Sequence, residues 1–480
     1  MVTEQERTSS SQGSRRIAVI GAGVSGLAAA KCLLEEGLEP VVYEQAPQIG
    51  GLWNYDEALP DGGGVMYRPL RTNTSKHTLA FSDFPLPKTA PYFPSHSEVL
   101  QYLREYAAHF GLYNYLHLNT MVESVEPTAH GQWTVCARSG ERVSTETFEA
   151  VLVCSGRDCS PKLVHSPATE TFAGSFLHSS SYKGPEEFAG KRIVVAGVGS
   201  SGVDIATELS KVAESLYLST EHGAWFIPRY VLGRPYDHKL TRLAERLPYR
   251  LRMFLFSRLL FIEYKRMGVT PHQLQAQGLP LPTFDLWSAR LTPCNDLLTR
   301  IESGAIQVKP HMMQLEGQQV RFADGSFAEV DTVICCTGYA LRFLFLSDAL
   351  LEIKQNGVEL YKHVFHPDFP TLAFIGLCNV AGSTFPVVEI QGRWVARVLA
   401  GSMHLPSREE MHVATERYRS HPSHRSPVPM QVQLLEYVED IAGMLGVRPH
   451  IWRHLGAAPR WFLGSFSAAH YRLDGPGKKP

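Results

Sequence analysis

Two segments far apart in the chain share one design, and they constrain the fold more than any other feature. The first is Arg16-Ile-Ala-Val-Ile-Gly21-Ala-Gly23-Val-Ser-Gly26, and the second is Arg192-Ile-Val-Val-Ala-Gly197-Val-Gly199-Ser-Ser-Gly202. Each begins with a β-branched run typical of a buried parallel strand and then turns through glycines into a helix-forming stretch. A further strand is predicted after each helix, at Pro40–Glu44 and Ser215–Ser219. The chain is therefore expected to contain two βαβ units.

The glycines of the first unit have separate physical roles. Gly21 permits the tight turn, Gly23 leaves room for a pyrophosphate, and Gly26 lets the helix pack closely on its strand. Glu44 ends the second strand, where an acid accepts hydrogen bonds from a ribose diol and would repel a 2′-phosphate. The acid therefore suits FAD or NAD rather than NADP. FAD is the predicted occupant, because the segment that follows resembles the one that flavoproteins place next. A second glycine-lined approach follows at Gly51, Leu52 and Trp53.

The second glycine set repeats this logic and predicts a nicotinamide dinucleotide. An enzyme with one flavin site and one nicotinamide site can pass a hydride from the second cofactor to the first. The alternative interpretation is a second fold of the same kind that binds no ligand. The residues predicted to bind this second cofactor are Gly197, Gly199, Ser200, Ser201, Gly202, Thr220 and Arg229.

The remaining segments fit an α/β fold with two Rossmann-like dinucleotide-binding domains, the second inserted into the first. Alternating polar and apolar residues around 121–125, 133–137 and 148–154 predict an antiparallel meander leading into another strand. Strands are also expected at 330–337 and 372–376, with a helix over about 388–399. The predicted divisions are a disordered tail over 1–14, an FAD-binding part over 15–167, an NAD(P)H-binding domain over 168–330 with a helical insertion at about 229–285, and a second FAD-binding part with a C-terminal segment over 331–480.

The insertion carries a basic and apolar helical pattern over Leu240–Lys265, interrupted by Pro248. One interpretation is an interfacial helix that touches a membrane, because Arg and Lys residues flank Phe254 and Phe261. The other is a buried insertion that roofs a substrate tunnel. The second is favoured, because the apolar residues nearly surround the helix instead of forming one stripe.

Composition excludes some classes of function. The chain has 46 Lys and Arg against 47 Asp and Glu, a net charge of −1, which does not support a nucleic-acid partner. None of its eight cysteines forms a Cys-x-x-Cys pair, so buried free thiols in a reducing compartment are favoured over a disulfide framework. No run of about 18 apolar residues predicts a spanning helix, and the polar N-terminus lacks a signal or transit pattern. A cytoplasmic location is expected, with peripheral membrane contact and a homo-oligomer both left open.

The stretch Phe172-Ala-Gly174-Ser-Phe-Leu-His178-Ser-Ser-Ser-Tyr182 lies just before the second glycine set. It resembles the identifying motif of the flavin-containing monooxygenases, Phe-x-Gly-x-x-x-His-x-x-x-(Phe/Tyr). Related Baeyer–Villiger enzymes usually carry Trp where this chain has Tyr182, so the resemblance favours oxygenation of a heteroatom. Further segments are similar to the family, so that the resemblance runs from about Arg15 to Gly477: Thr72–Lys76, Phe81–Pro85, Thr337–Tyr339, Leu360–Phe365, Glu389–Trp394 and Tyr471–Gly477.

The resemblance implies a mechanism similar to that of the N,N-dimethylaniline monooxygenases. NADPH, or NADH, reduces FAD, and the oxidised nicotinamide stays bound. O2 then forms a flavin C4a-hydroperoxide, and a nucleophilic nitrogen or sulfur of a small amine or thioether attacks its distal oxygen. Water has to be excluded, because a solvated hydroperoxide would decay to H2O2. No catalytic triad, paired carboxylates or metal ligands are expected.

The resemblance also implies roles for single residues. Asn73 aligns with the family Asn beside flavin and nicotinamide, where its amide can both donate and accept. It is the predicted catalytic residue, and the alternative is an Asx-type cap in a loop. Residues His178 and Tyr182 are assigned to packing and domain linkage. Cofactor contacts are also implied at Thr337, Gly338 and Gln391.

One position departs from the family pattern. The family usually places an Arg after the second strand of the nicotinamide unit, in patterns like Ser-x-Arg, to bind the 2′-phosphate of NADPH. This chain has Ser219-Thr220-Glu221-His222-Gly223. A carboxylate at Glu221 disfavours that phosphate but can bind the free ribose diol of NADH. We therefore expect a weakened NADPH preference, although Thr220, His222 or Arg229 could still contact a phosphate.

Three other functions stay open at this point. Baeyer–Villiger oxygenation of a ketone is disfavoured by Tyr182. An uncoupled NAD(P)H oxidase or redox sensor would have no organic substrate, and the intact Asn73 argues against it. A disulfide reductase-like flavoprotein would need a redox cysteine pair near the flavin, whereas Cys32 stands alone on the first helix.

Overall fold

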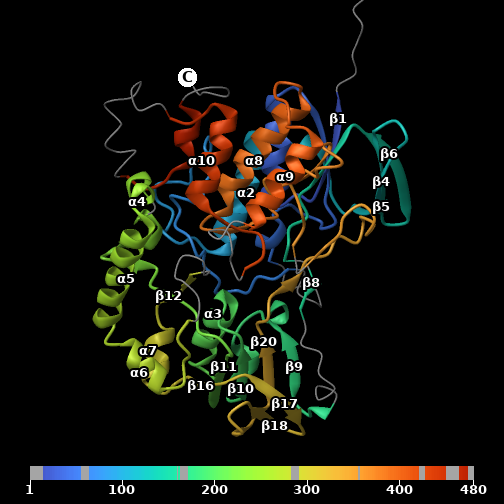
Figure 1. Ribbon diagram of the computed structural model, residues 1–480. Helices are drawn as coiled ribbons and strands as arrows, with labels where there is room; N and C mark the ends of the chain where they lie inside the picture. The colour runs from blue at the N-terminus through green and yellow to red at the C-terminus, as the bar shows by residue number, and fades with distance from the viewer. Residues whose placement is uncertain are drawn as a thin grey trace, which may run out of the picture.

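The computed structural model describes residues 15–55, 64–158, 160–162, 171–239, 241–282, 291–354, 357–420, 428–449 and 464–473. The predicted N-terminal tail and the last residues of the motif at Tyr471–Gly477 lie outside these ranges. Two five-stranded sheets organise the chain (Figure 1). We call the parts built on them the first lobe and the second lobe.

The sheet of the first lobe is parallel, with the strand order β22-β7-β1-β2-β3. Alternate residues of β1 face two different layers, which explains why almost the whole strand is buried. Ile17 and Val19 face helices α1, α8 and α10, while Ala18 and Ile20 face an antiparallel meander. The strands are β1 (Arg16–Ile20), β2 (Glu39–Tyr43), β3 (Leu116–His117), β7 (Ala150–Val153) and β22 (Leu372–Phe374).

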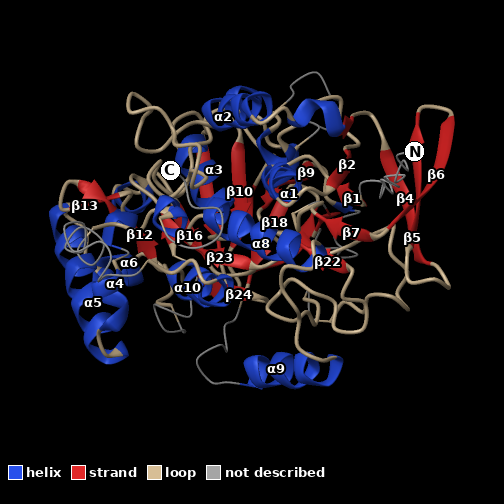
Figure 2. Ribbon diagram, turned by 90° about the horizontal axis from the view of Figure 1, so that it is seen from above, coloured by secondary structure: helices blue, strands red, loops and turns tan. Residues whose placement is uncertain are grey.

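Helices and the meander complete the first lobe. The predicted helix at about 388–399 is present but begins earlier, at Thr384. Figure 1 shows the meander projecting from the right side of the sheet, and Figure 2 shows α9 (Arg408–Ser420) at the edge of the lobe. The other elements are α1 (Val24–Glu35), α2 (His96–His109), α8 (Thr384–Leu399), α10 (Leu434–Leu445), β4 (Met121–Pro127), β5 (Trp133–Ser139), β6 (Arg142–Phe148), β23 (Asn379–Ala381) and β24 (Gln431–Gln433).

The second lobe repeats the design, with the strand order β16-β11-β10-β20-β9. One face of the sheet packs on α3 and α7, and the other on a small antiparallel sheet of β17, β18 and β19. The elements are β9 (Ser175–His178), β10 (Arg192–Ala196), α3 (Ser200–Leu209), β11 (Ser215–Ser219), α7 (Leu297–Glu302), β16 (Gln307–Lys309), β17 (Met312–Glu316), β18 (Gln319–Phe322), β19 (Phe327–Glu329) and β20 (Thr332–Cys335).

One predicted boundary needs correction. The division after residue 330 assigns the strand at 332–335 to the flavin-side part, but β20 pairs in parallel with β10 and β9 of the second lobe. The chain returns to the first lobe only after Cys335. Its return connection, β21 (Tyr339–Ala340), pairs antiparallel with β8 (Ser160–Pro161) of the outgoing connection. The two connections between the lobes therefore run side by side.

The insertion forms a column at the left of Figure 1. Its helices are α4 (Arg242–Arg246), α5 (Tyr249–Arg266) and α6 (Pro271–Ala276), and Pro248 separates the first two as predicted. Two short strand pairs flank them. One pairs β12 (Phe226–Ile227) with β15 (Thr292–Pro293), and the other pairs β13 (Tyr230–Val231) with β14 (Arg234–Pro235).

The favoured interpretation of this insertion, a buried helix, is wrong for α5. Only Leu260, Glu263 and Tyr264 of α5 are buried. Phe254 is 53% exposed and Phe261 is 51% exposed. Within the described residues, none of the helices combines the length and apolarity needed to cross a membrane.

Candidate functional site

The first glycine turn, between β1 and α1, closes tightly on itself. Gly21 has a φ angle of +104°, in the region that favours glycine. A Cβ atom at Gly26 would lie 1.8 Å from the carbonyl oxygen of Gly21. The tight turn therefore requires glycine at position 21, and the close packing of helix on strand requires glycine at position 26, as the sequence predicted.

Glu44 holds this turn from the end of β2. Its Oε2 accepts a hydrogen bond from the backbone N–H of Ala22 at 2.7 Å, and its Oε1 accepts one from Ala46 at 2.9 Å. The residue is 8% exposed. Because a carboxylate has about four acceptor positions, these two bonds leave capacity for a ribose diol.

A second glycine segment lies against the first turn. The N–H of Gly50 donates to the carbonyl of Ala22 at 3.0 Å, and a Cβ at Gly51 would lie 2.9 Å from the Cα of Gly23. Gly51 begins a short 3-10 helix, η1 (Gly51–Trp53), in which Leu52 is 40% exposed and Trp53 packs against the core. The predicted second approach to the dinucleotide is thus adjacent to the first.

The second glycine turn resembles the first but is more open. A Cβ at Gly202 would lie 2.0 Å from the carbonyl oxygen of Gly197, whereas nothing described lies within 4 Å of a Cβ at Gly199. Packing therefore explains Gly202 but leaves Gly199 to be explained by the approach of a ligand. Ser200 begins α3, and its buried Oγ has no hydrogen-bond partner among the described residues; Ser201 follows it and is half-buried.

The end of β11 presents an acid where the family Arg was expected. The side chains of Glu221 and His222 are both 64% exposed. Thr220 is buried, and its hydroxyl donates to the carbonyl of His222 at 2.6 Å. Arg229 points elsewhere, since its Nη2 lies 3.7 Å from Oδ1 of Asp204 on α3. Burial raises the pKa of Asp204, and the Arg229 charge opposes that rise.

Asn73 lies in the loop between η1 and α2. Its neighbour Thr72 fixes the loop backbone, donating from its N–H to the carbonyl of Pro94 and from its hydroxyl to the carbonyl of Thr74, both at 2.9 Å. The Oδ1 of Asn73 is buried and has no partner in the described part of the chain. An Asx-type cap needs this oxygen as an acceptor, so that alternative does not hold, and the unpartnered acceptor suits a ligand or water.

The family motif around His178 joins the two lobes, as expected. His178 Nε2 donates to the carbonyl of Gly338 at 3.0 Å, and its ring lies against Tyr339. Thr337 donates from its hydroxyl to the carbonyl of Lys162. These contacts hold the outgoing and returning connections together.

Tyr182 completes the motif inside the second lobe. It is fully buried, and its hydroxyl donates to Glu208 of α3 at 2.9 Å. Its ring packs edge-on against Tyr67, which the first lobe contributes. Both motif residues therefore act in packing and linkage, and Thr337 and Gly338 lie at this junction.

Gln391 is placed in the core rather than at a surface. It is 0% exposed, accepts from the N–H of Gly376 at 2.8 Å, and donates to the hydroxyl of Tyr437 at 2.8 Å. Its amide thus links the end of β22, α8 and α10. Gln391 would therefore affect a flavin only indirectly, through the position of the Gly376 backbone that it binds.

Arg472 collects three family-like segments into one buried charge network. Its guanidinium donates to Ser82 at 2.9 Å, to Glu35 at 3.0 Å and to Glu389 at 3.3 Å. Arg472 is 4% exposed, Ser82 and Glu389 are buried, and Glu35 is partly exposed. A buried Lys31–Asp83 ion pair adjoins the network. The network fixes the C-terminal segment on α1 and α8.

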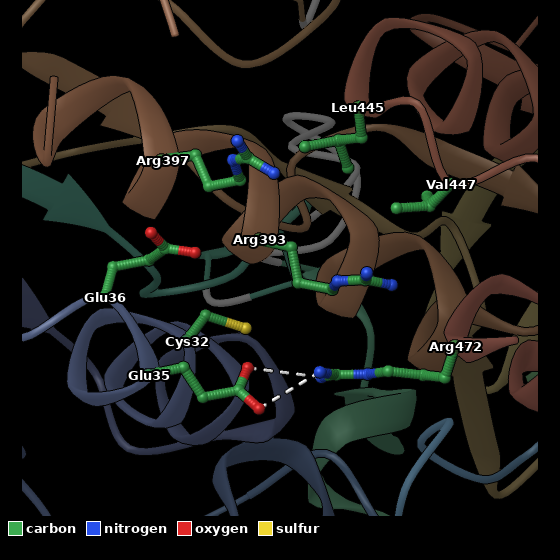
Figure 3. Close-up of a pocket in the computed structure, with 8 residues that line it drawn as sticks. All are labelled: Cys32, Glu35, Glu36, Arg393, Arg397, Leu445, Val447 and Arg472. Atoms are coloured by element: carbon green, nitrogen blue, oxygen red, sulfur yellow. Dashed lines mark hydrogen bonds and ion pairs between the residues drawn. The ribbon is translucent and has the colours of Figure 1, made fainter. Parts of the chain in front are cut away.

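A cavity of about 190 Å³ adjoins this network (Figure 3). The Glu35–Arg472 pair forms one side, and Arg393 and Arg397 of α8 line another. The cavity lies at the C-terminal end of α1, whereas the glycine turn lies at its N-terminal end. The family-like segments that contain Ser82, Glu389 and Arg472 therefore stabilise the first lobe at a distance from the glycine turns.

The seven described cysteines are free, as predicted, and Cys159 lies outside the described residues. Burial raises the pKa of the Cys32 thiol to about 12. A thiol with so high a pKa is a poor redox nucleophile, which argues against the disulfide reductase interpretation. The described residues also contain no group of three His, Cys, Asp or Glu side chains placed to hold a metal ion.

The sequence interpretation missed two acids at the lobe junction, Asp204 and Asp237. Tyr67 of the first lobe donates from its hydroxyl to Asp204 at 3.0 Å, and Ser75 donates from its N–H to Asp237 at 2.7 Å. Each acid follows an apolar or aromatic neighbour within a buried stretch, which is an uncommon place for a carboxylate. That local signal could have identified them.

These features fit two dinucleotides. Within the described part of the chain, nothing lies within 4 Å of a Cβ placed at Gly199, and Asn73 and Ser200 leave buried polar atoms unpartnered. Glycine turns at the N-termini of α1 and α3 present backbone N–H groups and the positive helix ends that bind phosphate. The arrangement can therefore bind one dinucleotide at each turn, with Asn73 contributed by the first lobe.

Comparison with known proteins identifies the family. A family model described as flavin-binding monooxygenase-like matches residues 14–480. Flavin-containing monooxygenase 5 of Mus musculus is 38% identical over 97% of this chain and 90% of its own length. Dimethylaniline monooxygenase (N-oxide-forming) 2 of Macaca mulatta is 36% identical over 97% of this chain and 89% of its own length.

Solved structures show the same fold. An S-allyl-L-cysteine S-oxygenase from Allium sativum has a TM-score of 0.66 at 24% identity, covering 96% of this chain and 97% of its own. An open crystal structure of cyclohexanone monooxygenase has a TM-score of 0.67 at 17% identity, covering 90% of this chain and 98% of its own. With its two glycine turns and a family match over nearly its whole length, the chain belongs to the flavin-binding monooxygenase family and is a flavin-dependent monooxygenase.

Proposed function

We propose that this enzyme uses FAD and a nicotinamide dinucleotide to transfer one oxygen atom of O2 to a nucleophilic nitrogen or sulfur of a small molecule. The observation that carries the proposal is Asn73, whose buried Oδ1 is left without a partner in the described chain, in a loop that both lobes contact. Relatives named as N-oxide-forming and a structural neighbour named as an S-oxygenase support the substrate class, a tertiary amine or a thioether.

The residues divide between the two proposed cofactors. The first turn, with Gly21, Gly23 and Gly26, holds the FAD pyrophosphate at the N-terminus of α1, and Glu44 binds its ribose. Bound FAD supplies the oxygen-activating chemistry. The second turn, with Gly197, Gly199 and Gly202, holds the nicotinamide dinucleotide, and Ser200 and Ser201 at the start of α3 add donors. The amide of Asn73 orients the bound groups, and the surrounding protein excludes water.

We propose that NADH is an efficient reductant alongside NADPH. The exposed Glu221 stands at the end of β11, and Arg229 is already paired with Asp204 at 3.7 Å. A carboxylate there accepts hydrogen bonds from a free ribose diol, and it repels a 2′-phosphate. Comparable kcat/KM values for NADH and NADPH are therefore expected, and a strong bias to NADPH would contradict this part of the proposal.

The main experiment measures how nicotinamide consumption is coupled to product. The purified enzyme is supplied with FAD, NADH or NADPH, and a tertiary amine, a thioether or a cyclic ketone. Formation of an N-oxide or sulfoxide equal to the nicotinamide consumed supports the proposal. A lactone as the main product would establish Baeyer–Villiger oxygenation instead, and stoichiometric H2O2 with every substrate would establish an oxidase or sensor.

We also propose that α5 contacts a membrane surface. Its exposed apolar residues include Phe254 and Phe261, and the Arg258 guanidinium lies 5.0 Å from the Phe254 ring centre. Apolar side chains beside basic ones suit the boundary of an anionic bilayer. The free thiols of the described cysteines support a location facing the cytoplasm. Co-sedimentation with anionic liposomes, lost in a Phe254→Ser/Phe261→Ser variant, is expected, and equal sedimentation of both proteins would contradict the contact.

A further inference from the structure

Asp237 lies at the start of the insertion, in the 3-10 helix η6 (Tyr236–Lys239) that follows β14. It is 1% exposed. Its Oδ2 accepts a hydrogen bond from the N–H of Ser75 at 2.7 Å and another from the hydroxyl of Thr78 at 2.9 Å. Both donors belong to the first-lobe loop that carries Asn73. A single oxygen atom, Oδ2 of Asp237 in the insertion, therefore fixes that loop.

The carboxylate of Asp237 is buried beside His77 and His238, and burial lowers the pKa of both imidazoles. Among the described residues, its Oδ2 is bound by neutral donors, and its Oδ1 is buried with no hydrogen-bond partner. Burying an unpaired charge costs free energy, so packing alone gives no reason to keep an acid at this position. Such groups concentrate at functional sites.

The rest of the loop is fixed from the opposite side. The N–H of Lys76 donates to the carbonyl of Tyr92 at 2.8 Å, and Thr72 is bound to the carbonyl of Pro94. The rings of His77 and His238 meet edge-on at 4.5 Å and close the junction beside Asp237. Asn73 thus lies between two anchors, one formed by its own lobe and one formed by Asp237.

We propose that Asp237 is a positioning residue, which holds the Asn73 amide in the orientation that the bound cofactors require. This inference rests on the proposed function, because it assigns a task to Asn73 there. It also couples the lobes, since the insertion of the second lobe sets the geometry of a first-lobe loop. Loss of the carboxylate releases one side of the loop and leaves the reaction less protected from water.

The test uses the holoenzyme and measures H2O2 released per nicotinamide consumed in the presence of an N-oxidisable tertiary amine. We call this ratio the leak. Asp237→Asn keeps the side-chain size and removes the charge, so we expect this leak to rise and the kcat/KM for the amine to fall about tenfold. Thr78→Val should raise the leak by a smaller factor. Thr78→Ser keeps the hydroxyl donor, so its leak should equal that of the wild type. Asp296→Asn, an exposed acid of the same lobe, is the matched control.

A double variant separates this inference from the proposed function. If Asp237 acts through Asn73, the leak of Asp237→Asn/Asn73→Ser should equal that of Asn73→Ser alone. Additive effects, or a normal leak in both Asp237→Asn and Thr78→Val, would overturn the positioning role. A normal leak in Asn73→Ser itself would contradict the proposed role of Asn73, and with it the inference. Thermal unfolding of each variant shows whether a change reflects lost stability, and an effect of Thr78→Val with unchanged melting temperature supports the inference.

Discussion

The two glycine turns have nearly the same sequence pattern, yet the protein surrounds them differently. The first is held by Glu44 through the N–H of Ala22, and a second glycine segment touches it at Gly51. In the described protein the second has open space at Gly199, and the acid after its second strand, Glu221, is exposed. The first turn is thus the more enclosed of the two, and the second is the more open. The same motif is proposed to bind phosphate in both, while the neighbouring residues decide how tightly each turn is enclosed.

The largest expected effect tests what the two turns share. Gly26→Ala and Gly202→Ala each place a Cβ about 2 Å or less from a carbonyl oxygen, at 1.8 Å and 2.0 Å. Each variant should lose about 3 kcal/mol of folding free energy, because helix and strand have to separate. Thermal unfolding and flavin content measure the loss. A variant that keeps the wild-type melting temperature would show that its turn can accommodate a methyl group, contrary to the geometry.

The next effect concerns the acid at the open turn. Glu221→Arg should raise the ratio of kcat/KM for NADPH over NADH about 100-fold, because repulsion is replaced by a charge-assisted contact to phosphate. Steady-state kinetics with both cofactors measure it. Glu214→Arg, at the opposite end of β11, makes the same charge change as a control. An unchanged ratio would mean that Glu221 does not face the adenosine ribose.

A smaller effect separates ligand binding from packing. Gly199→Ala has space for its methyl group in the described protein, so its melting temperature should stay within about 1 °C of wild type. The KM for the nicotinamide dinucleotide should rise about tenfold, because the methyl group occupies the approach of the pyrophosphate. If KM is unchanged as well, the second turn binds no dinucleotide in this way.

The smallest effect compares the two acids directly. Glu44→Gln weakens two hydrogen bonds to the backbone of the first turn and should cost about 1 kcal/mol of stability. Glu221→Gln changes an exposed side chain and should stay within about 0.5 kcal/mol of wild type. Denaturant unfolding measures both. Equal losses would remove the distinction between an acid that holds its turn and one that does not.

Local pattern was enough to predict most elements near the site. β-Branched runs followed by glycines predicted β1, β10 and the helices after them, and strands before Glu44 and at Ser215–Ser219 are confirmed. The alternation that predicted the meander is confirmed in β4 and β5. Long-range placements were harder. The ion pair of Arg229 with Asp204 was not predicted, and the exposure of α5 opposes the burial that its apolar residues favoured.

The sequence by itself determined the two βαβ units, the glycine turns and the family, because these depend on spacing between neighbouring residues. The tertiary structure alone decided which lobe receives β20, how Arg472 joins Glu35 and Glu389, and that Asp237 binds the loop of Asn73. These contacts join residues separated by 83 to 437 positions, or depend on which lobe a strand enters. Periodicity reports only which residues are buried, whereas the packing of whole elements decides which buried groups meet.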